Sequence, residues 1–269
     1  MIALAIMPLI AHAAILHGGW RLGWIAVGLS ALVVGLVPTA LLMVRRPEDA
    51  GLLADPHPRS ESSIETPGAG PLAAVDEPSF TRAEALATPA FWMLALFTLL
   101  IYPVQAGVSL HQAPHLIERG LDSTAAALIV AIFSLASAFS GLAFGPLIRR
   151  AGIRWALALV AVILGASSAM MIWVREPQFA TLTAALYGVG IGGLLTGLPL
   201  AWVETFGRRS FGAIRGAALS IQVAAQAAGP LISGALRDWT GDYVLSLWTF
   251  AVMAALALAS ALLIRPATR

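Results

Sequence analysis

The sequence has 269 residues, of which 59% are hydrophobic and 11% charged, whereas a soluble domain averages about 25% charged residues. This deficit excludes an ordinary soluble enzyme, and the absence of cysteine excludes disulfide frameworks and thiolate chemistry. All 16 basic residues are arginine, which excludes lysine-based covalent catalysis, and a net charge of +2 is too small for a nucleic-acid interface. We therefore expect an all-α polytopic membrane protein in the lipid bilayer.

Eight apolar stretches approach or exceed the roughly 20 residues that a helix needs to cross the hydrocarbon core. The first is the shortest and contains Pro8 and His12, whereas the other seven are long enough to span a bilayer with some tilt. The predicted spans are residues 3–17, 22–44, 90–111, 123–148, 155–174, 179–203, 212–236 and 243–264.

The arginines predict the orientation of these spans, because cytoplasmic loops carry an excess of basic residues. When the spans alternate, one side receives only Arg21, Arg119, Arg175 and Arg237. The other side receives Arg45, Arg46, Arg59, Arg82, Arg149, Arg150, Arg154, Arg208, Arg209, Arg215, Arg265 and Arg269. Both termini are therefore expected in the cytoplasm, and a bacterial cytoplasmic (inner) membrane is the expected location.

Tryptophans at span ends indicate where the helices meet the lipid headgroups, because the indole ring is amphipathic. Those at predicted span ends are Trp20, Trp24, Trp92, Trp155, Trp173, Trp202 and Trp239.

The longest polar stretch, residues 45–88, is rich in proline, glycine, serine and acidic residues and predicts a flexible cytoplasmic linker. It divides the chain into residues 1–44, with two spans, and residues 89–269, with six. Within it, Thr81 and Glu84 have the spacing of a capping box, which predicts a short helix leading into the third span.

The loops after the fourth and seventh spans share a pattern. Both read Gly-x-Leu with a second glycine seven residues after the first, from Gly145 to Gly152 and from Gly234 to Gly241. The two loops are expected on opposite sides of the membrane. This placement favours two three-span units of opposite orientation, as in many transporters, over six unrelated helices.

Several stretches carry a family resemblance. Residues 18–21 read Gly-Gly-Trp-Arg, residues 45–52 Arg-Arg-Pro-Glu-Asp-Ala-Gly-Leu and residues 206–212 Phe-Gly-Arg-Arg-Ser-Phe-Gly, followed by Gly229-Pro230 and the pattern up to Tyr243. They resemble the major facilitator superfamily, in its oxalate/formate-antiporter and monocarboxylate-porter-like branch. The resemblance implies twelve helices in two six-helix bundles. This chain would hold helices five to twelve, so that residues 1–44 are the remnant of an N-terminal bundle and the first four helices are missing.

The resemblance also implies a set of gating residues. In the loop between the family's helices eight and nine, Arg150, Gly152 and Arg154 match the usual pattern, whereas Arg149 stands where aspartate is usual. Glu204, at the cytoplasmic end of the sixth span, is the candidate for the missing carboxylate. The complete candidate gating set is Gly145, Arg149, Arg150, Gly152, Arg154, Glu204, Arg215, Asp238 and Gly241. Gly141 stands where organic-anion members carry an arginine, which argues against a monocarboxylate substrate.

Polar residues inside the spans form two stripes. At 100° per residue, Arg215, Gln222, Gln226, Gly229 and Ser233 share one face of the seventh span. A broader face of the third span carries a second set, and both stripes are expected to face a cavity, the alternative being hydrogen bonds between neighbouring helices. The candidate substrate-binding residues are Tyr102, Gln105, Ser109, Gln222 and Gln226.

His111 and His115 have a spacing that suits a metal or a proton relay, but Pro114 interrupts the geometry and no third ligand is evident. We therefore expect interfacial histidines, with no metal site and no cofactor.

These features predict a secondary active transporter of a small organic solute, with an organic anion as one candidate, working by alternating access without covalent chemistry. A non-transporting scaffold or a fragment that needs a partner chain is the first alternative. An integral membrane enzyme acting on lipids is the second, although no paired-acid motif supports it.

Overall fold

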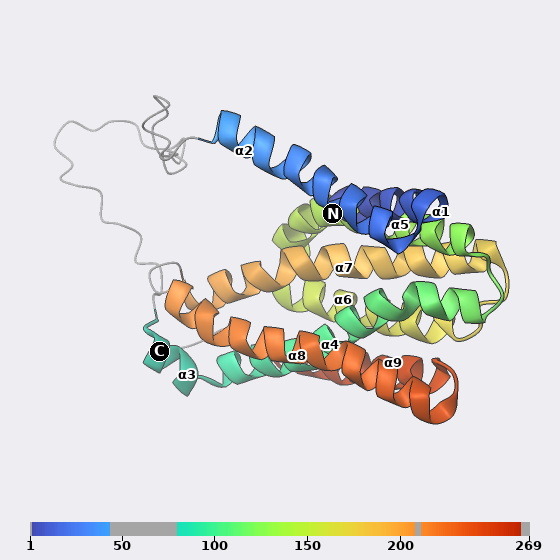
Figure 1. The fold of residues 1–269 in the computed structure, drawn as a ribbon. Helices are drawn as coiled ribbons and strands as arrows, with labels where there is room; N and C mark the ends of the chain where they lie inside the picture. Colours follow the sequence, from blue (N-terminus) through green and yellow to red (C-terminus); the bar gives the residue numbers. More distant parts are fainter. Residues whose placement is uncertain (1, 44–79, 208–210, 265–269) are drawn as a thin grey trace. The chain divides into compact units, whose positions relative to one another are not determined.

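The computed structural model describes residues 2–43, 80–207 and 211–264, and every regular element in these ranges is helical (Figure 1). The elements are α1 (Ile2–Ala31), η1 (Leu32–Leu36), α2 (Val37–Leu42), α3 (Arg82–Ala87), α4 (Pro89–Glu118), α5 (Ser123–Ala151), α6 (Ile153–Met171), α7 (Pro177–Phe206), α8 (Phe211–Thr240) and α9 (Val244–Leu263).

By length and apolarity, the described residues contain seven helical stretches able to cross a membrane, one fewer than the eight expected. The difference lies at the N-terminus, where Ile6–Leu41 counts as a single stretch of 36 residues. It is interrupted at Gly18 and Gly19, whose backbone is not helical, and Gly19 has a φ of +75°. A continuous helix of that length would rise about 54 Å, nearly twice the hydrocarbon thickness. We therefore still predict that this stretch crosses the membrane twice, with the turn at Gly18 and Gly19.

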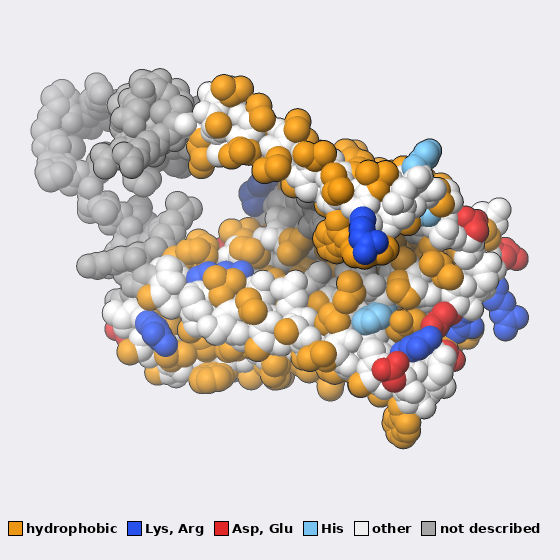
Figure 2. All heavy atoms as spheres, in the orientation of Figure 1, with side chains coloured by type: hydrophobic (Ala, Val, Ile, Leu, Met, Phe, Trp, Pro, Cys, Tyr) orange, Lys and Arg blue, Asp and Glu red, His pale blue; other side chains and the backbone are white. Residues whose placement is uncertain are grey.

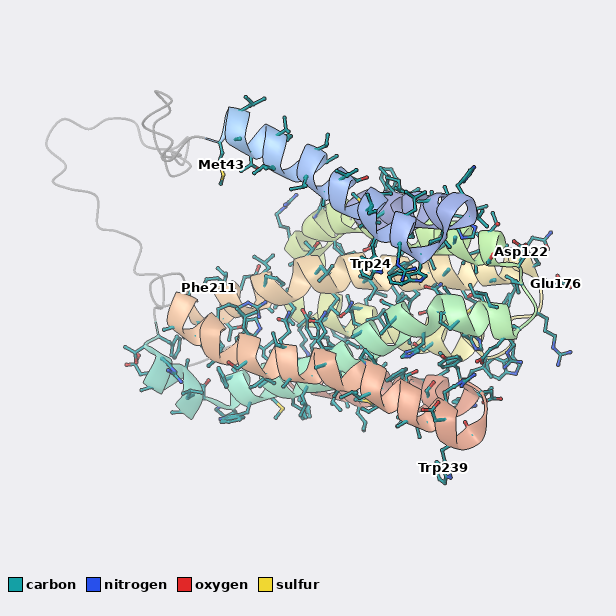
Figure 3. The ribbon with its side chains drawn as sticks, viewed as in Figure 1. Trp24, Met43, Asp122, Glu176, Phe211 and Trp239 are labelled. Atoms are coloured by element: carbon teal, nitrogen blue, oxygen red, sulfur yellow. The ribbon has the colours of Figure 1, made fainter. Side chains whose placement is uncertain are left out.

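The chain forms two compact units, residues 1–12 with 78–269 and residues 13–77. Among the described residues of the second unit, most large apolar side chains are exposed, including Trp24 and Met43 (Figure 3). Most of the predicted linker lies outside the described residues. The capping box at its end is confirmed, because Thr81 Oγ1 accepts from the Glu84 amide at 3.3 Å and Glu84 Oε2 accepts from the Thr81 amide at 2.7 Å.

Six long helices, α4 to α9, build the bundle of the first unit. Helix α4 packs against α8 and α9, α5 packs against α7, and α6 packs against α7 and α9. Exchanging α4 with α7, α5 with α8 and α6 with α9 leaves this set of pairings unchanged. Asp122, Glu176 and Trp239 lie at one end of the bundle and Phe211 at the other, so that α4 and α7 run in opposite directions (Figure 3). The predicted 3+3 inverted repeat is confirmed.

The two related loops have the same local structure. Gly152 ends α5 with a φ of +83°, and Gly241 follows α8 with a φ of +87°. Each glycine amide donates to the carbonyl oxygen four residues earlier at 2.8 Å, Ile148 and Arg237 respectively. A side chain is strained at such a φ, so the second glycine of the shared pattern has a conformational cause.

An aromatic cluster corrects one prediction about the tryptophans. Trp202 is 0% exposed, and its ring stacks on that of Phe206 with centroids 5.9 Å apart. The Phe91 ring packs edge-on against the Trp202 ring, with centroids 5.3 Å apart. Phe80, just before α3, adds a ring contact and donates its amide to the Phe206 carbonyl. Trp202 is therefore a core residue and not a headgroup anchor.

The other six predicted anchors each have more than half of their surface exposed. Apolar side chains also cover much of the visible face of the molecule, as expected when the solvent is lipid (Figure 2).

Candidate functional site

An open groove lies between α4 and α8, with a volume of about 490 Å³. Its polar lining consists of Gln105 and Ser109 from α4 and Gln226 from α8, and Leu110, Val223 and Pro230 belong to its apolar lining. Three of the five predicted substrate-binding residues therefore meet in one cavity.

Gln105 and Gln226 contact each other across this groove. The Gln226 Nε2 donates to Gln105 Oε1 at 3.2 Å, and this pair is exposed. The cavity interpretation and the interhelical hydrogen-bond interpretation of the α8 stripe thus both apply here. The amides line an open groove, and they also join α4 to α8. The Gln105 Nε2 and the Gln226 Oε1 are not used in this bond, so each amide keeps a group able to bind a solute.

The other two predicted residues lie beside the groove. Arg215 Nη2 donates to Gln222 Oε1 at 3.0 Å, and both side chains are partly buried on α8. Tyr102 is buried on α4 with its hydroxyl near the Arg215 guanidinium. None of these three residues lines the groove. The stripe on α8 therefore divides into Arg215 and Gln222, which bond to each other nearer the start of the helix, and Gln226, which lines the groove.

Close backbone contact fixes the crossing of α4 and α8 next to the groove. A Cβ atom at Gly229 would overlap the Pro103 carbonyl oxygen and approach the Gly107 amide. Further along α8, the buried Ser233 donates to Ser246 of α9 at 3.3 Å. The C-terminal part of the predicted stripe, Gly229 and Ser233, therefore serves helix packing.

Two residues of this region are absent from the sequence-based set. Tyr187 of α7 is fully buried, and its hydroxyl lies 2.9 Å and 3.0 Å from the Val104 and Gln105 carbonyl oxygens. It supports the backbone that carries Gln105. Glu118 forms an ion pair with Arg237 at 2.9 Å, joining the ends of α4 and α8. A tyrosine within a span and opposite charges at two span ends are the signals that point to them.

The histidine prediction needs a correction. His115 is 2% exposed, and its Nε2 forms a hydrogen bond with the Met171 carbonyl oxygen of α6 at 2.9 Å. It therefore joins α4 to α6 inside the bundle and is not interfacial. His111 Nδ1 bonds to the Gly107 carbonyl oxygen of its own helix. No group of three metal-ligating side chains occurs within the described ranges.

The predicted gating residues occupy both ends of the bundle. Arg149, Arg150 and Arg154 are exposed around Gly152, between α5 and α6, and Gly145 is partly buried one turn before Arg149. Within residues 2–43, 80–207 and 211–264, the ion pairs are those of Arg237 with Glu118 and with Asp238. Glu204 is exposed at the end of α7 and forms no ion pair there. Arg237 and Asp238 precede Gly241 at the opposite end.

Comparison with known proteins decides the family. The model of the Major Facilitator Superfamily matches residues 1–218 and 113–269. The chain belongs to this family. The resemblance to this superfamily is confirmed, and the chain is an integral membrane protein.

The curated relatives carry two kinds of name. Human monocarboxylate transporter 11 is 28% identical over 242 residues, which are 85% of this chain and 46% of that protein. The membrane sensor protein UhpC of Salmonella typhimurium is 31% identical over 145 residues, and that of Escherichia coli is 31% identical over 150 residues. Each UhpC match covers 52% of this chain and 32% of the sensor. The chain thus spans less than half the length of these relatives.

Proposed function

We propose that this chain is part of a secondary active transporter that moves a small organic solute by alternating access. The groove between α4 and α8 carries the proposal, because it places the amides of Gln105 and Gln226 on open walls within an apolar bundle. Polar groups inside a membrane are costly, so those that line a cavity are candidates for solute contact. A volume of about 490 Å³ falls in the range of small-molecule sites.

The lining suggests how a solute binds. Its accessible polar groups are the two amides, which offer both donors and acceptors and carry no charge, whereas the Ser109 hydroxyl is buried. Arg215 and Arg237 lie eleven residues before and after Gln226 on α8, and Arg237 is paired with Glu118, so Arg215 is the candidate cation for an anionic solute. The relative named a monocarboxylate transporter makes organic monocarboxylates the first solutes to test, and because Gly141 replaces the arginine of organic-anion members, Arg215 would have to supply the positive charge.

The groove is one wall of the proposed site. In this proposal the opposite wall comes from an N-terminal bundle, to which residues 1–44 belong, or from a partner chain. Residues 45–88 connect it to the bundle of residues 89–269. Transport then consists of rocking one bundle against the other around a bound solute, without covalent chemistry and without a cofactor.

We also propose a bacterial cytoplasmic membrane with both termini on the cytoplasmic side. The end of the bundle with Arg149, Arg150 and Arg154 is the cytoplasmic end in this orientation, and the end with Glu118 and Arg237 is the outer end. The support is the unequal distribution of arginine between the two sets of loops.

Uptake of radiolabelled lactate and pyruvate into cells that express the full gene tests the proposal. Gln226→Leu is expected to reduce uptake about 5- to 150-fold, because it removes amide groups worth about 1 to 3 kcal/mol to a bound solute. Ser220→Ala is the control, since Ser220 is exposed on the same helix and bonds only to the Gly216 carbonyl. Normal uptake by the Gln226→Leu variant, at equal protein in the membrane, would contradict the assignment of the groove.

The name of the UhpC relatives favours a second candidate, a membrane sensor that binds a solute without moving it. The same groove would serve that role. A solute that raises the thermal unfolding temperature of the wild-type protein, but is not taken up, would select the sensor. A solute that does both would select the transporter.

A further inference from the structure

Three arginines form an unbalanced basic patch where α5 meets α6. Arg149 and Arg150 end α5, and Arg154 lies in the first turn of α6, beyond the turn at Gly152. All three side chains are exposed. We call them the α5–α6 arginine patch.

No carboxylate in the described part of the chain forms an ion pair with this patch. The sequence has no acidic residue between Asp122 and Glu176, so both helices lack one along their whole length. The ion pairs of the described ranges all belong to Arg237, at the opposite end of the bundle. The patch therefore presents three positive charges at the end of two membrane helices.

An apolar surface continues from the patch along α6. Trp155, Leu159 and Val162 follow one another at the spacing of one helical face, with exposed fractions of 59%, 40% and 47%. The Arg154 guanidinium lies 5.6 Å from the centre of the Trp155 ring. A cationic group, an interfacial indole and exposed aliphatic side chains thus follow in that order from the helix end into the membrane.

We propose that the α5–α6 arginine patch binds the headgroup of an anionic phospholipid, with its acyl chains along Trp155, Leu159 and Val162. Guanidinium groups bind phosphate oxygens by bidentate, charge-assisted hydrogen bonds. Basic residues next to a membrane helix attract anionic lipids, and the apolar face of α6 matches the acyl chains. The other end of α6 is the internal contrast, because Trp173 is exposed there but the neighbouring Arg175 is followed directly by Glu176.

Native mass spectrometry of the full chain tests the proposal, with phosphatidylglycerol and phosphatidylcholine of matched acyl chains as probes. The wild type is expected to bind phosphatidylglycerol more tightly than phosphatidylcholine. Replacing all three patch arginines by glutamine should weaken phosphatidylglycerol binding roughly 100-fold, about fivefold for each charge. Replacing them by lysine keeps the charge and should preserve the preference for the anionic lipid. Arg175→Gln is the matched control and should bind both lipids as the wild type does.

Equal affinity of the wild type for the two lipids would overturn the proposal, as would unchanged binding by the triple glutamine variant. Soluble glycerol phosphate should not displace the lipid at equal concentration, because it lacks acyl chains, and displacement would assign the patch to free phosphates instead. If the glutamine variant does not fold, wild-type binding is measured against sodium chloride. Binding should weaken as salt rises, and a salt-independent affinity would also overturn the proposal.

Discussion

Two helix pairs of the bundle occupy equivalent places in the inverted repeat but differ in how they are closed. Gly188 and Gly192 of α7 lie directly on the α5 backbone, where added Cβ atoms would overlap the carbonyl oxygens of Phe133 and Ser137. Ser140 then joins the pair through a 2.7 Å bond to the Val189 carbonyl. The α4–α8 pair has one such crossing, at Gly229, and opens beside it into the groove.

The inverted repeat allows single residues of the open and the closed helix pair to be compared at corresponding positions. Gln226 lies eight residues before Gly234, and Ser137 lies eight residues before Gly145, so the two positions correspond. Ser137 is 1% exposed beneath Gly192, whereas Gln226 is exposed on the wall of the groove. One architecture thus supplies both a sealed helix pair and an open one. We infer that the open pair is the place for function.

The largest expected effect comes from forcing the sealed pair apart. Gly192→Ala should lower the free energy of unfolding by about 3 kcal/mol, because its Cβ would overlap the Ser137 carbonyl and the backbone must move. Gly216→Ala on α8 is the control, since none of the described residues lies within 4 Å of its added Cβ. Thermal unfolding of both purified variants measures the difference, and equal stability of the two would show that the α5–α7 contact is looser than described.

A smaller effect is expected at the crossing of the open pair. Gly229→Ala should destabilise the protein by about 1 to 2 kcal/mol, because α8 can shift at the groove to relieve the contact with Pro103. The same shift should change solute binding, which Gly192→Ala should alter less. Unfolding temperature and lactate uptake, measured on both variants, separate the two responses. If Gly229→Ala and Gly192→Ala lost uptake in the same proportion to their lost stability, the two helix pairs would not differ in function.

About half of the candidate site could be predicted from the sequence. The spacing of Gln222 and Gln226 predicts that they share one face of α8, since helical periodicity is a local property, and of the two only Gln226 lines the groove. Tyr102 and Gln222 were assigned to the same cavity, but they lie beside Arg215, because only tertiary packing decides where along a shared face the groove opens.

The fold was more predictable than the contacts between distant segments. The capping box and the two related glycine loops depend on neighbouring residues, and both are present in the structure. The burial of Trp202 involves Phe91, which is far from it in sequence and packs against its ring. Periodicity at a span end does not distinguish such a core tryptophan from an interfacial one.

The smallest effect is expected from one hydrogen bond within the sealed pair. Ser140→Ala removes the bond to the Val189 carbonyl and should cost about 1 kcal/mol of stability, with uptake unchanged. Chemical denaturation in detergent measures this change. A loss of uptake without a loss of stability would place function on the α5–α7 pair and would remove the contrast between the two pairs.

Cysteine accessibility tests the central claim most directly, because the chain contains no cysteine and each introduced thiol is the only one present. Gln226→Cys and Ser137→Cys place thiols at corresponding positions of the repeat, and a membrane-impermeant methanethiosulfonate reagent modifies thiols that contact water. The account predicts rapid modification of the Gln226→Cys variant in the purified full chain, slowed by a bound solute, and no modification of the Ser137→Cys variant. Equal modification of both, or protection of the Gln226→Cys variant without any solute, would contradict it.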